Sequence, residues 1–539
     1  SEIQFDEVRA RRHPTAGDKL YRNDGGKFVD ISESAGIKGT GLGFGLSVIA
    51  SDINGDDWPD LLVTNDYIEP DYLYLNNGDG TFTDKMQDHL QHISHFSMGA
   101  DIADLNHDGR PEIFTLDMLP ENNERQKLLY GPENYEQYNL MLSRNFYHQL
   151  MRNMLHVNHG NGLFSEIGQL AGISNTDWSW SALFFDANND AEKDLLVTNG
   201  YYRDYTNRDF LKYKGDYYFK QAVAKEKADT LHLVTSMSST PIHDYLFENQ
   251  GNITFKNISS QAGFSSPNFS SGAAYADLDR DGDLDLIVNR LNETAGILEN
   301  KSQKGNWLQI QLQEESQNPF AVGAKVSVWA GGKLHFQELQ PVRGFQSSSS
   351  PVLHFGLGIA EKADQIEIVW PDGSWQKLDQ IRINQRIEIQ KEGTSDIKTV
   401  ESKKAALLEK LDNVPDFNPS LSKINDFKRQ PLLVNMPSHL GPILATTDLN
   451  RDGKPEIFIG GNKGQTGRIY TFSEGNWEVY RGFRSSGDFT DAVVIFEDFN
   501  QDGYPDLLLG SGGYHDYTST DQSLRDRLYL NDGSGVLIP

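Results

Sequence analysis

Short apolar runs separated by polar turns recur along the whole chain. Examples are DLLVTN after Pro59 and DLIVN after Leu284, and each is followed after a short gap by an Asn-Gly-rich segment. Short runs bounded by turn residues are typical of β-strands and hairpins. Helical patterning is found mainly in two segments, 134–154 and 216–227. The pattern therefore predicts an all-β fold.

Two phrases repeat along the chain. The first, Asp-x-Asn/Asp-x-Asp-Gly-x-x-Asp/Glu, occurs six times, at 52–60, 104–112, 186–194, 277–285, 448–456 and 498–506, with Asp57 in place of Gly in the first copy and Ala191 in the third. The second is rich in Asn and Gly, as in LYLNNGDGTF from Leu73. Asn23 and Asn76 of this phrase lie 53 residues apart, and insertions lengthen the next two spacings to 82 and 91. Units of about fifty residues made of short strands predict propeller blades rather than a helical solenoid.

The first phrase has the residue types of a calcium loop. Oxygens at positions 1, 3, 5 and 9, with the carbonyl of position 7, form the hard oxygen cage that Ca²⁺ prefers, whereas Mg²⁺ retains more water. Gly at position 6 supplies the positive φ that the turn requires. We predict about four to six structural Ca²⁺ ions. The predicted ligands are Asp52, Asn54, Asp56, Trp58, Asp60, Asp104, Asn106, Asp108, Arg110, Glu112, Asp186, Asn188, Asp190, Asp194, Asp277, Asp279, Asp281, Asp283, Asp285, Asp448, Asn450, Asp452, Lys454, Glu456, Asp498, Asn500, Asp502, Tyr504 and Asp506.

Two other interpretations of the phrase were considered. An EF-hand requires Glu at position 12 and a following helix, but position 12 is Val, Thr, Ile or Leu and a strand pattern follows. Asp-Gly clusters also occur as plain turns, an explanation that weakens when six copies share one spacing. The fourth copy has the fullest set of carboxylates. The third has Ala191 at the glycine position and is the weakest candidate.

Composition narrows the class of protein. The net charge is −28, from 77 acidic and 49 basic residues, and such a surface disfavours nucleic acid and anionic lipid. The absence of cysteine excludes disulfides, thiolate zinc sites and cysteine nucleophiles. The sequence contains no run of 18 apolar residues, so it predicts no membrane-spanning helix. The first twenty residues lack the apolar stretch of a signal peptide, so the protein is cytosolic or a leader has been removed.

The repeats resemble the FG-GAP/VCBS repeats of integrin-type β-propellers, which implies a structural Ca²⁺ in each loop. Residues 303–392 resemble an ASPIC/UnbV domain through VGAKVSVWAGGK from Val322, RGFQSSSS from Arg343, LHFGLG from Leu353, IEIVWPDG from Ile366 and NQRIEI from Asn384. Without the resemblance, the alternating apolar residues of this stretch and its WPDG and AGGK turns already predict a small β-sandwich or barrel. The combination is similar to the cartilage acidic protein family. The phrases LDMLPENNERQ from Leu116, TDWSWSALFFD from Thr176 and VTNGYYRDYTNRDF from Val197 are still more similar to Bacteroidota surface lipoproteins found with SusC/SusD-type importers.

The resemblance implies four segments: propeller blades at 1–302, the ASPIC/UnbV domain at 303–392, a linker at 393–431 and further blades at 432–539. The last blades either start a second propeller or complete the first. The chain opens on the second phrase and stops just after LYLNDGSG, so we expect a fragment of a longer protein. The resemblance also implies an extracellular or bacterial cell-surface location, with lipid anchoring to the outer membrane through a segment absent from this chain.

The sequence offers few catalytic candidates. His89, His92 and His95, or His148, His156 and His159, could form zinc groups, but structural or solvated histidines explain them as well. HExxH, nucleophile-elbow and P-loop motifs are absent. Aromatic residues in the insertions are candidate contacts for a partner, either as anchors or as the cores of small subdomains. These are Tyr135, Tyr138, Tyr147, Tyr201, Tyr202 and Tyr205, and Arg203 is a candidate contact beside them.

The sequence therefore favours a non-catalytic, calcium-binding surface protein that binds or scaffolds a partner. The expected partners are an outer-membrane importer or other surface proteins, with glycan or peptide as further ligands. The alternatives are a polysaccharide lyase or hydrolase on a propeller scaffold, and an integrin-like adhesin. Fold alone does not separate these functions.

Overall fold

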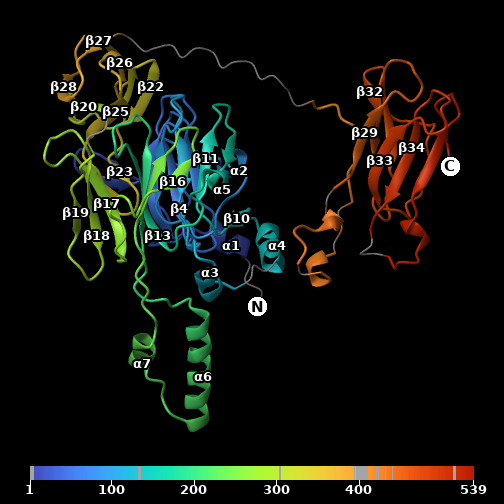
Figure 1. Ribbon diagram of the computed structural model, residues 1–539, viewed down its shortest axis with the longest axis horizontal. Helices are drawn as coiled ribbons and strands as arrows, with labels where there is room; N and C mark the ends of the chain where they lie inside the picture. The colour runs from blue at the N-terminus through green and yellow to red at the C-terminus, as the bar shows by residue number, and fades with distance from the viewer. Residues whose placement is uncertain are drawn as a thin grey trace. The chain divides into compact units, whose positions relative to one another are not determined.

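The computed structural model describes residues 5–131, 135–302, 305–393, 395, 411–420, 422, 424–430, 432–439, 441–513 and 517–539. The chain divides into two compact units, Ser1–Val400 and Glu401–Pro539 (Figure 1). Strands dominate both units, so the predicted all-β class is confirmed. Within the described ranges, no helix is long and apolar enough to cross a membrane.

Four antiparallel sheets of the first unit repeat one strand order, in which each strand pairs with the next along the chain. The fourth sheet has three strands and the others have four. The strands are β3 (Gly45–Ser51), β4 (Asp60–Asn65), β5 (Tyr72–Asn76) and β6 (Phe82–Asp84); β8 (Ala100–Ala103), β9 (Glu112–Thr115), β11 (Met154–Asn158) and β12 (Phe164–Glu166); β13 (Ser179–Phe185), β14 (Asp194–Asn199), β15 (Tyr245–Asn249) and β16 (Phe255–Asn257); and β17 (Ser270–Ala276), β18 (Asp285–Arg290) and β19 (Gly296–Leu298).

Neighbouring sheets share a core because successive side chains of a strand point to opposite faces. In β13, Phe184 packs with residues of the β8–β12 sheet, while Leu183 and Phe185 pack with residues of the β17–β19 sheet. Another cluster joins the first two sheets. The first strands β3, β8, β13 and β17 contact one another in chain order. The sheets are therefore stacked face to face, with their first strands together.

Shorter elements decorate these sheets. A separate hairpin, β1 (Tyr21–Asn23) and β2 (Phe28–Asp30), has the sequence of the second phrase, and β7 (Ile93–Ser94) pairs in parallel with β10 (Gln149–Leu150). The helices are α1 (Phe5–Ala10), α2 (Met86–His89), α3 (Asn123–Leu129), α4 (Tyr135–Ser143), α5 (Gly168–Ala171), α6 (Arg208–Ala224) and α7 (Thr230–Thr235). The two predicted helical segments are thus shifted: the first helix ends at Ser143, and the second begins at Arg208.

The segment from β20 to β28 forms two sheets around one core. One sheet contains β20 (Asn306–Gln313), β25 (Val352–Gly358) and β28 (Gln385–Gln390); the other contains β21 (Lys325–Ala330), β22 (Lys333–Glu338), β26 (Ala363–Val369) and β27 (Trp375–Ile381). Alternate residues of both sheets, among them Ile310, Val328 and Ile366, are fully buried in one cluster. This is a small β-sandwich.

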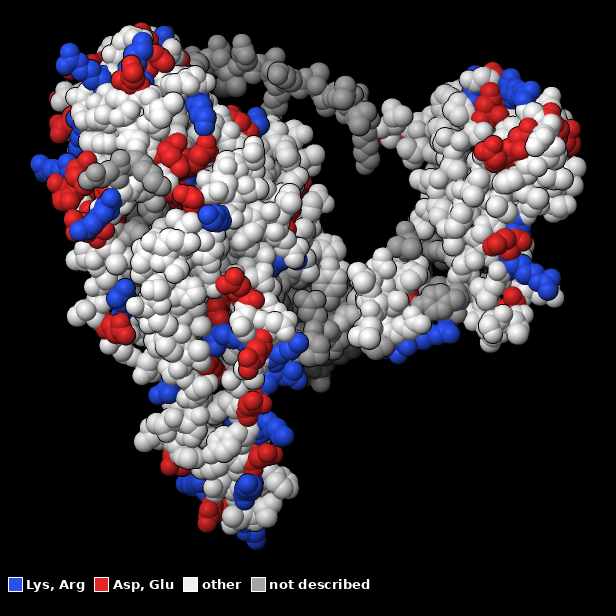
Figure 2. Space-filling model, in the orientation of Figure 1, with Lys and Arg blue, Asp and Glu red and all other residues white. Residues whose placement is uncertain are grey.

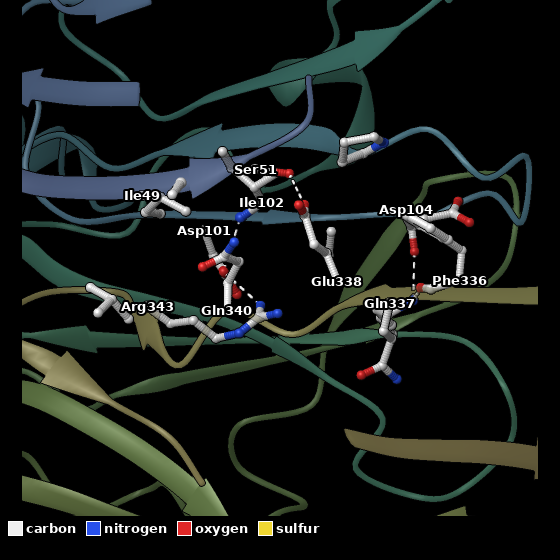
Figure 3. Close-up of a pocket in the computed structure, with 15 residues that line it drawn as sticks. Ile49, Ser51, Asp101, Ile102, Asp104, Phe336, Gln337, Glu338, Gln340 and Arg343 are labelled. Carbon is white, nitrogen blue, oxygen red and sulfur yellow. Dashed lines mark hydrogen bonds and ion pairs between the residues drawn. The ribbon is translucent and has the colours of Figure 1, made fainter. Parts of the chain in front are cut away.

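A hairpin from this sandwich, β23 (Val342–Arg343) and β24 (Ser347–Ser348), reaches the first strands of the other sheets. Strand β23 contacts β3 and β13, and β24 contacts β17. Arg343 forms a buried ion pair with Asp101, with 2.8 Å between Nη1 and Oδ1, and Glu338 accepts a hydrogen bond of 2.6 Å from Ser51 Oγ (Figure 3). The hairpin therefore lies between the first and the fourth sheets.

The second unit contains two further four-stranded antiparallel sheets of the same order. Their strands are β29 (Leu444–Thr447), β30 (Glu456–Ile459), β31 (Arg468–Ser473) and β32 (Asn476–Val479), and β33 (Asp491–Glu497), β34 (Asp506–Ser511), β35 (Arg527–Asn531) and β36 (Leu537–Ile538). Short 3-10 turns are η1 (Asp426–Lys428), η2 (Pro437–His439) and η3 (Gln522–Leu524). Phe458, Leu507 and Tyr529 form the shared core of these two sheets.

Candidate functional site

The acidic phrase forms the same turn in all six copies, between the first and second strands of a sheet. Position 6 has a positive φ each time, including the two copies in which it is Asp57 (72°) and Ala191 (83°). Position 4 is also left-handed, although its residue type varies: Gly55, His107, Asn189, Arg280, Arg451 and Gln501. The positive φ expected at position 6 is confirmed. Position 4 was missed because no single residue type marks it.

Backbone amides hold the acidic side chains in place. In every copy the carboxylate of position 1 accepts the N–H of position 6, as in Gly503 to Asp498 Oδ2 at 2.7 Å. In every copy the carboxylate of position 5 accepts the N–H of position 7. Acceptors fixed in this way face the inside of the turn at little further entropic cost.

The carboxylate of position 9 links the two repeated phrases. In the first loop, Asp60 Oδ2 accepts the N–H of Ile53 at 3.0 Å and Oδ1 accepts the N–H of Asn76 at 2.8 Å. The same pair of bonds occurs at Asp194, Asp285 and Asp506. An Asn at or just after the end of the third strand thus bonds to position 9 of the acidic phrase in the same sheet, and in three of these four sheets it is the Asn of the second phrase.

Acidic groups of the loops crowd one another. Burial and the carboxylates of Asp104 and Asp108 raise the pKa of Glu112 to about 8, although backbone N–H groups oppose the shift. Burial and the nearby Asp52 and Asp56 likewise raise the pKa of Asp60 to about 7. A cation among such groups would reverse the shift, because it favours the ionised form.

The fourth loop fits a cation best. Asp277, Asp279 and Asp281 bring their carboxylate oxygens within 4.8 Å of one another, the one such group of His, Asp or Glu side chains in the described ranges. Asp277 Oδ1 and Asp283 Oδ1 are buried without a hydrogen-bond partner. Converging anionic oxygens with unsatisfied lone pairs match the donor set of Ca²⁺.

The first loop fits a cation less well. Lys325 of the sandwich reaches it and forms ion pairs with Asp52 and, at 2.6 Å, with Asp57 Oδ1. Its ammonium supplies positive charge at the first loop, as Arg110 does at the second loop, where it forms an ion pair with Asp108. The third loop, expected to be weakest, folds like the others despite Ala191.

The sandwich contacts the other loops of the first unit as well. Gln309 donates to Asp277 Oδ2 at 2.7 Å, and His107 hydrogen-bonds with the carbonyl of Leu334 at 2.9 Å. His354 hydrogen-bonds with Asn189 Oδ1 at 2.7 Å. All four loops therefore lie at the edge of the sheets that the sandwich covers.

Within the described ranges, neither histidine group brings three ligand atoms within 4.8 Å of one another. His92 pairs with Glu166 at 3.2 Å, while His95 stacks on Phe96 and burial lowers its pKa to about 4. His156 is buried, and burial lowers its pKa to about 4 also. The Tyr138 hydroxyl and His148 Nδ1 form a hydrogen bond of 2.7 Å. These contacts support structural roles for the histidines.

Part of the predicted aromatic set lines one cleft of about 570 Å³. Tyr201, Tyr202, Arg203 and Tyr205 lie on its wall together with Trp180 and Phe345, the tip of the β23–β24 hairpin. Tyr201 stacks on Trp178 with 4.4 Å between ring centroids and 19° between planes. The three tyrosines remain 37–41% exposed, so they are not simply core.

The other predicted aromatics lie elsewhere. Tyr147 donates to the carbonyl of Leu90 at 2.7 Å, and Tyr135 and Tyr138 belong to α4. None of these three lines the cleft. The sequence had grouped all of them because they share a residue type and lie in insertions.

Helices α6 and α7 form an arm that projects from the sheets (Figure 1). Its exposed apolar side chains include Tyr213, Tyr218, Phe219 and Leu231. Charges of both signs lie along the same arm (Figure 2). The arm and the aromatic cleft are the two exposed aromatic regions of the insertion at 200–240.

Comparison with known proteins identifies one kind of repeat and one further domain. Residues 52–115, 233–288 and 448–509 match the FG-GAP-like repeat, and residues 314–396 match the family described as ASPIC and UnbV. The chain therefore contains FG-GAP repeats, which are typical of extracellular or surface proteins, and an ASPIC and UnbV domain.

Several known proteins are similar to parts of the chain. It is 27% identical over 354 residues to cartilage acidic protein 1 of Homo sapiens, covering 64% of this chain and 42% of that protein. It is 34% identical over 108 residues to cartilage acidic protein 1 of Xenopus tropicalis, covering 19% of this chain and 16% of that protein. It is 35% identical over 86 residues to integrin alpha-6 of Homo sapiens, covering 14% of this chain and 8% of that protein. The chain thus spans less than half the length of these relatives. The V. cholerae biofilm matrix protein Bap1 aligns with 10% identity over 95% of this chain and 80% of its own, but the TM-score of 0.20 is too low to indicate a shared fold.

Proposed function

We propose that this protein is a non-catalytic, calcium-stabilised β-propeller protein of the cell surface that binds or scaffolds a partner. The observation that carries the proposal is the sixfold repetition of one acidic turn, with a positive φ at positions 4 and 6 and carboxylates turned inward. Face-to-face stacking of the sheets, with their first strands together, is the packing of propeller blades.

In this proposal calcium stabilises the fold and takes no part in chemistry. Asp277, Asp279, Asp281 and Asp285, with the carbonyl of Asp283, would hold an ion in the fourth loop. The ion would neutralise carboxylates that otherwise repel, and so would tie the first strand of a sheet to the second. The sandwich contacts the loops of the first unit, and the aromatic cleft and the α6–α7 arm lie apart from these contacts as proposed surfaces for a partner.

The resemblance to Bacteroidota surface lipoproteins suggests which partner to test first, a SusC/SusD-type outer-membrane importer. Within the described residues, the histidines are engaged in structural contacts, and the densest carboxylates belong to the loops. These observations favour binding over the hydrolase or lyase alternative.

Calcium binding is tested by isothermal titration of the chelator-treated protein. We expect binding with several sites and a rise in melting temperature on calcium addition, since an ion that binds only the folded state stabilises it. If titration to millimolar calcium gives no binding heat, or if calcium leaves the melting temperature unchanged, the calcium part of the proposal is contradicted.

Partner binding is tested by co-purification with the importer from detergent-solubilised outer membranes. The comparison is between the wild-type chain and the Tyr202→Ala/Arg203→Ala double variant, with Tyr21→Ala on the β1 hairpin as the control. We expect the importer with the wild type and the control, and a reduced yield with the double variant. Turnover of a polysaccharide by the purified protein would instead support the enzyme alternative.

A further inference from the structure

The aromatic cleft lies at the end of the sheets opposite the acidic loops. The loops join the end of a first strand to the start of the second, whereas Trp180 opens β13 and Gly200 directly follows β14. Phe269, Ser270 and Leu291 line the same cleft and flank the corresponding ends of β17 and β18. The cleft is therefore separate from the candidate calcium sites.

The wall of the cleft is a preformed aromatic platform. Tyr201 is nearly parallel to both Trp178 and Trp180, with interplanar angles of 19° and 29°. Trp180 is packed in turn against Phe345, with 4.8 Å between centroids. Tyr202 meets Phe269 edge to face at 5.3 Å. Rings that hold one another in this way lose little conformational freedom when a flat ligand stacks on them.

Polar groups at the platform are available to a ligand. The hydroxyl groups of Tyr201, Tyr202 and Tyr205 make no hydrogen bond with another described residue. Arg203 lies with its guanidinium 5.0 Å from the centre of the Tyr202 ring and donates to the carbonyl of Met237 at 3.0 Å. It forms no ion pair within the described part of a chain that has 77 acidic and 49 basic residues.

We propose that this cleft binds an acidic sugar, a pyranose ring that bears a carboxylate, as part of an extracellular polysaccharide. The proposal deepens the binding role proposed above and rests on it. The apolar C–H face of the ring would stack on Tyr201 or Tyr202, and the phenol groups would bond to ring hydroxyls. The carboxylate would take the unpaired face of Arg203, because a guanidinium binds a carboxylate with two parallel hydrogen bonds.

Size and charge distinguish this ligand from others. A cleft of about 570 Å³ lies within the range of small-ligand sites and accommodates one or two sugar units. An alkyl chain or apolar peptide would bury the guanidinium without an anion to pair with it, which is costly. A neutral sugar would leave the Arg203 guanidinium without an anionic partner.

The ASPIC and UnbV domain contributes to this site. Phe345 is 7% exposed and stands at the tip of the RGFQSSSS hairpin, and Ser347 Oγ donates to its carbonyl at 2.7 Å. Arg343 fixes the hairpin through Asp101. The hairpin thus supplies a wall of the cleft, and sugar binding requires it to be docked between the sheets.

The test uses the full chain and a panel of defined saccharides. The acidic probes are trimers of galacturonate, mannuronate and guluronate and a hyaluronan tetrasaccharide; the neutral probes are galactotriose and mannotriose. Binding is followed by isothermal titration and by tryptophan fluorescence, since Trp180 lines the cleft. We expect at least one acidic probe to bind with a Kd below about 1 mM, and its neutral counterpart to bind about tenfold more weakly or not at all.

Variants separate the roles of the residues. Arg203→Gln should abolish the preference for acidic over neutral probes, and Arg203→Lys should restore part of it. Phe345→Leu, which preserves most of the apolar volume, should weaken binding with a small change in melting temperature. Arg22→Gln on the β1 hairpin, an exposed arginine paired with Asp24, serves as the matched control.

Three outcomes would overturn the proposal. They are equal affinity for acidic and neutral trimers, unchanged binding in Arg203→Gln, and no binding of any probe at 1 mM. If no saccharide binds but the importer still co-purifies, the proposed scaffolding function stands and the sugar site does not. If saccharide binds and the importer does not co-purify, the sugar site stands alone.

Discussion

Each carboxylate of the acidic phrase has a distinct position and a distinct set of bonds. Position 9 is tied to the backbone of its own turn and of the following hairpin, so its removal would uncouple strands even without a metal. Position 5 lies in the turn itself and is a carboxylate in every copy, whereas position 3 is Asn in every copy but the fourth. The carboxylate of position 5 accepts the N–H of position 7 in the same turn, as in Asp283 to Asp281. Position 5 is therefore where a metal effect is most cleanly separated from a structural one.

Asp281→Asn should reduce the stabilisation by calcium without lowering stability in the absence of calcium. In chelator the substitution removes one of three converging carboxylates, so repulsion falls and the melting temperature should rise or stay constant. With calcium it removes an anionic ligand, so the rise caused by calcium should shrink by several degrees, on the order of 1 kcal/mol. Thermal scans in calcium and in chelator give the measurement.

The matched control is Asp190→Asn at the same position of the third loop, where Ala191 replaces glycine. Its calcium-dependent shift should be smaller than that of Asp281→Asn. Equal calcium-dependent shifts in the two variants would show that the fourth loop does not bind calcium more tightly than the third.

The buried carboxyl of Asp71 should make the protein less stable above neutral pH. Burial raises its pKa to about 7, although the Asn65 N–H and the Ser97 hydroxyl donate to it at 2.8 Å each. The folded state therefore holds this proton more tightly than the unfolded state, in which the pKa is about 4. Its contribution is fully present below about pH 4 and is lost as the pH rises through about 7.

Asp71→Asn retains an acceptor for Asn65 and resembles the protonated acid. At pH 8 the variant should be more stable than the wild type by about 1–4 kcal/mol, and at pH 4 the two should differ little. Denaturation at both pH values checks this, with the exposed Asp379→Asn as control. A variant that is less stable than the wild type at pH 8 would show that Asp71 is ionised and well compensated.

At the scale of elements, the β23–β24 hairpin is held by close contacts of its backbone. Gly344 has a φ of 66°, and a Cβ there would collide with Ser181 Oγ. Its carbonyl accepts from Ser47 Oγ at 2.8 Å and its N–H donates to Ala100 O at 3.0 Å. The hairpin is therefore bonded to the first two sheets and packed closely against the third.

Breaking the Arg343–Asp101 pair should undock the hairpin. Both side chains are nearly inaccessible, so Arg343→Met leaves an uncompensated buried carboxylate and should cost about 3–5 kcal/mol. The double change Arg343→Met/Asp101→Leu should recover a large part of that loss, because neither charge remains. Unfolding free energies and hydrogen exchange of 339–350 give the readout. Additive losses in the double variant would contradict a coupled pair.

The sequence predicted the elements better than their contacts. The turns and strands of the repeats could be anticipated because local residue types determine them: Asp oxygens, a left-handed position 6 and alternating apolar residues. The hairpin could not, since RGFQSSSS has no alternating pattern and its partners Ser47, Asp101 and Ser181 are distant in the chain. Lys325 was missed as a partner of Asp52 for the same reason. The sequence predicted only part of the aromatic cleft. Tyr201, Tyr202 and Tyr205 are close together in the sequence, whereas Phe345 belongs to the ASPIC and UnbV domain.

At the scale of the whole molecule, the candidate calcium loops are divided between two compact units. Four loops belong to Ser1–Val400 and two, at 448–456 and 498–506, belong to Glu401–Pro539. Each unit has its own buried clusters, among them Phe184 and Leu195 in the first and Phe458 and Leu507 in the second. Units with separate cores unfold as separate cooperative blocks unless their interface is large.

Calorimetry of the full chain should therefore show two transitions, each moved upward by calcium. Asp502→Asn removes an anionic ligand from a loop of the second unit and should lower only one transition in calcium. Asp281→Asn acts on the first unit and should lower only the other. In chelator the two substitutions should leave both transitions nearly unmoved or slightly higher, because the lost charge was repulsive. If either substitution shifts both transitions together, the two units unfold as one cooperative block, and the prediction of independent transitions is wrong.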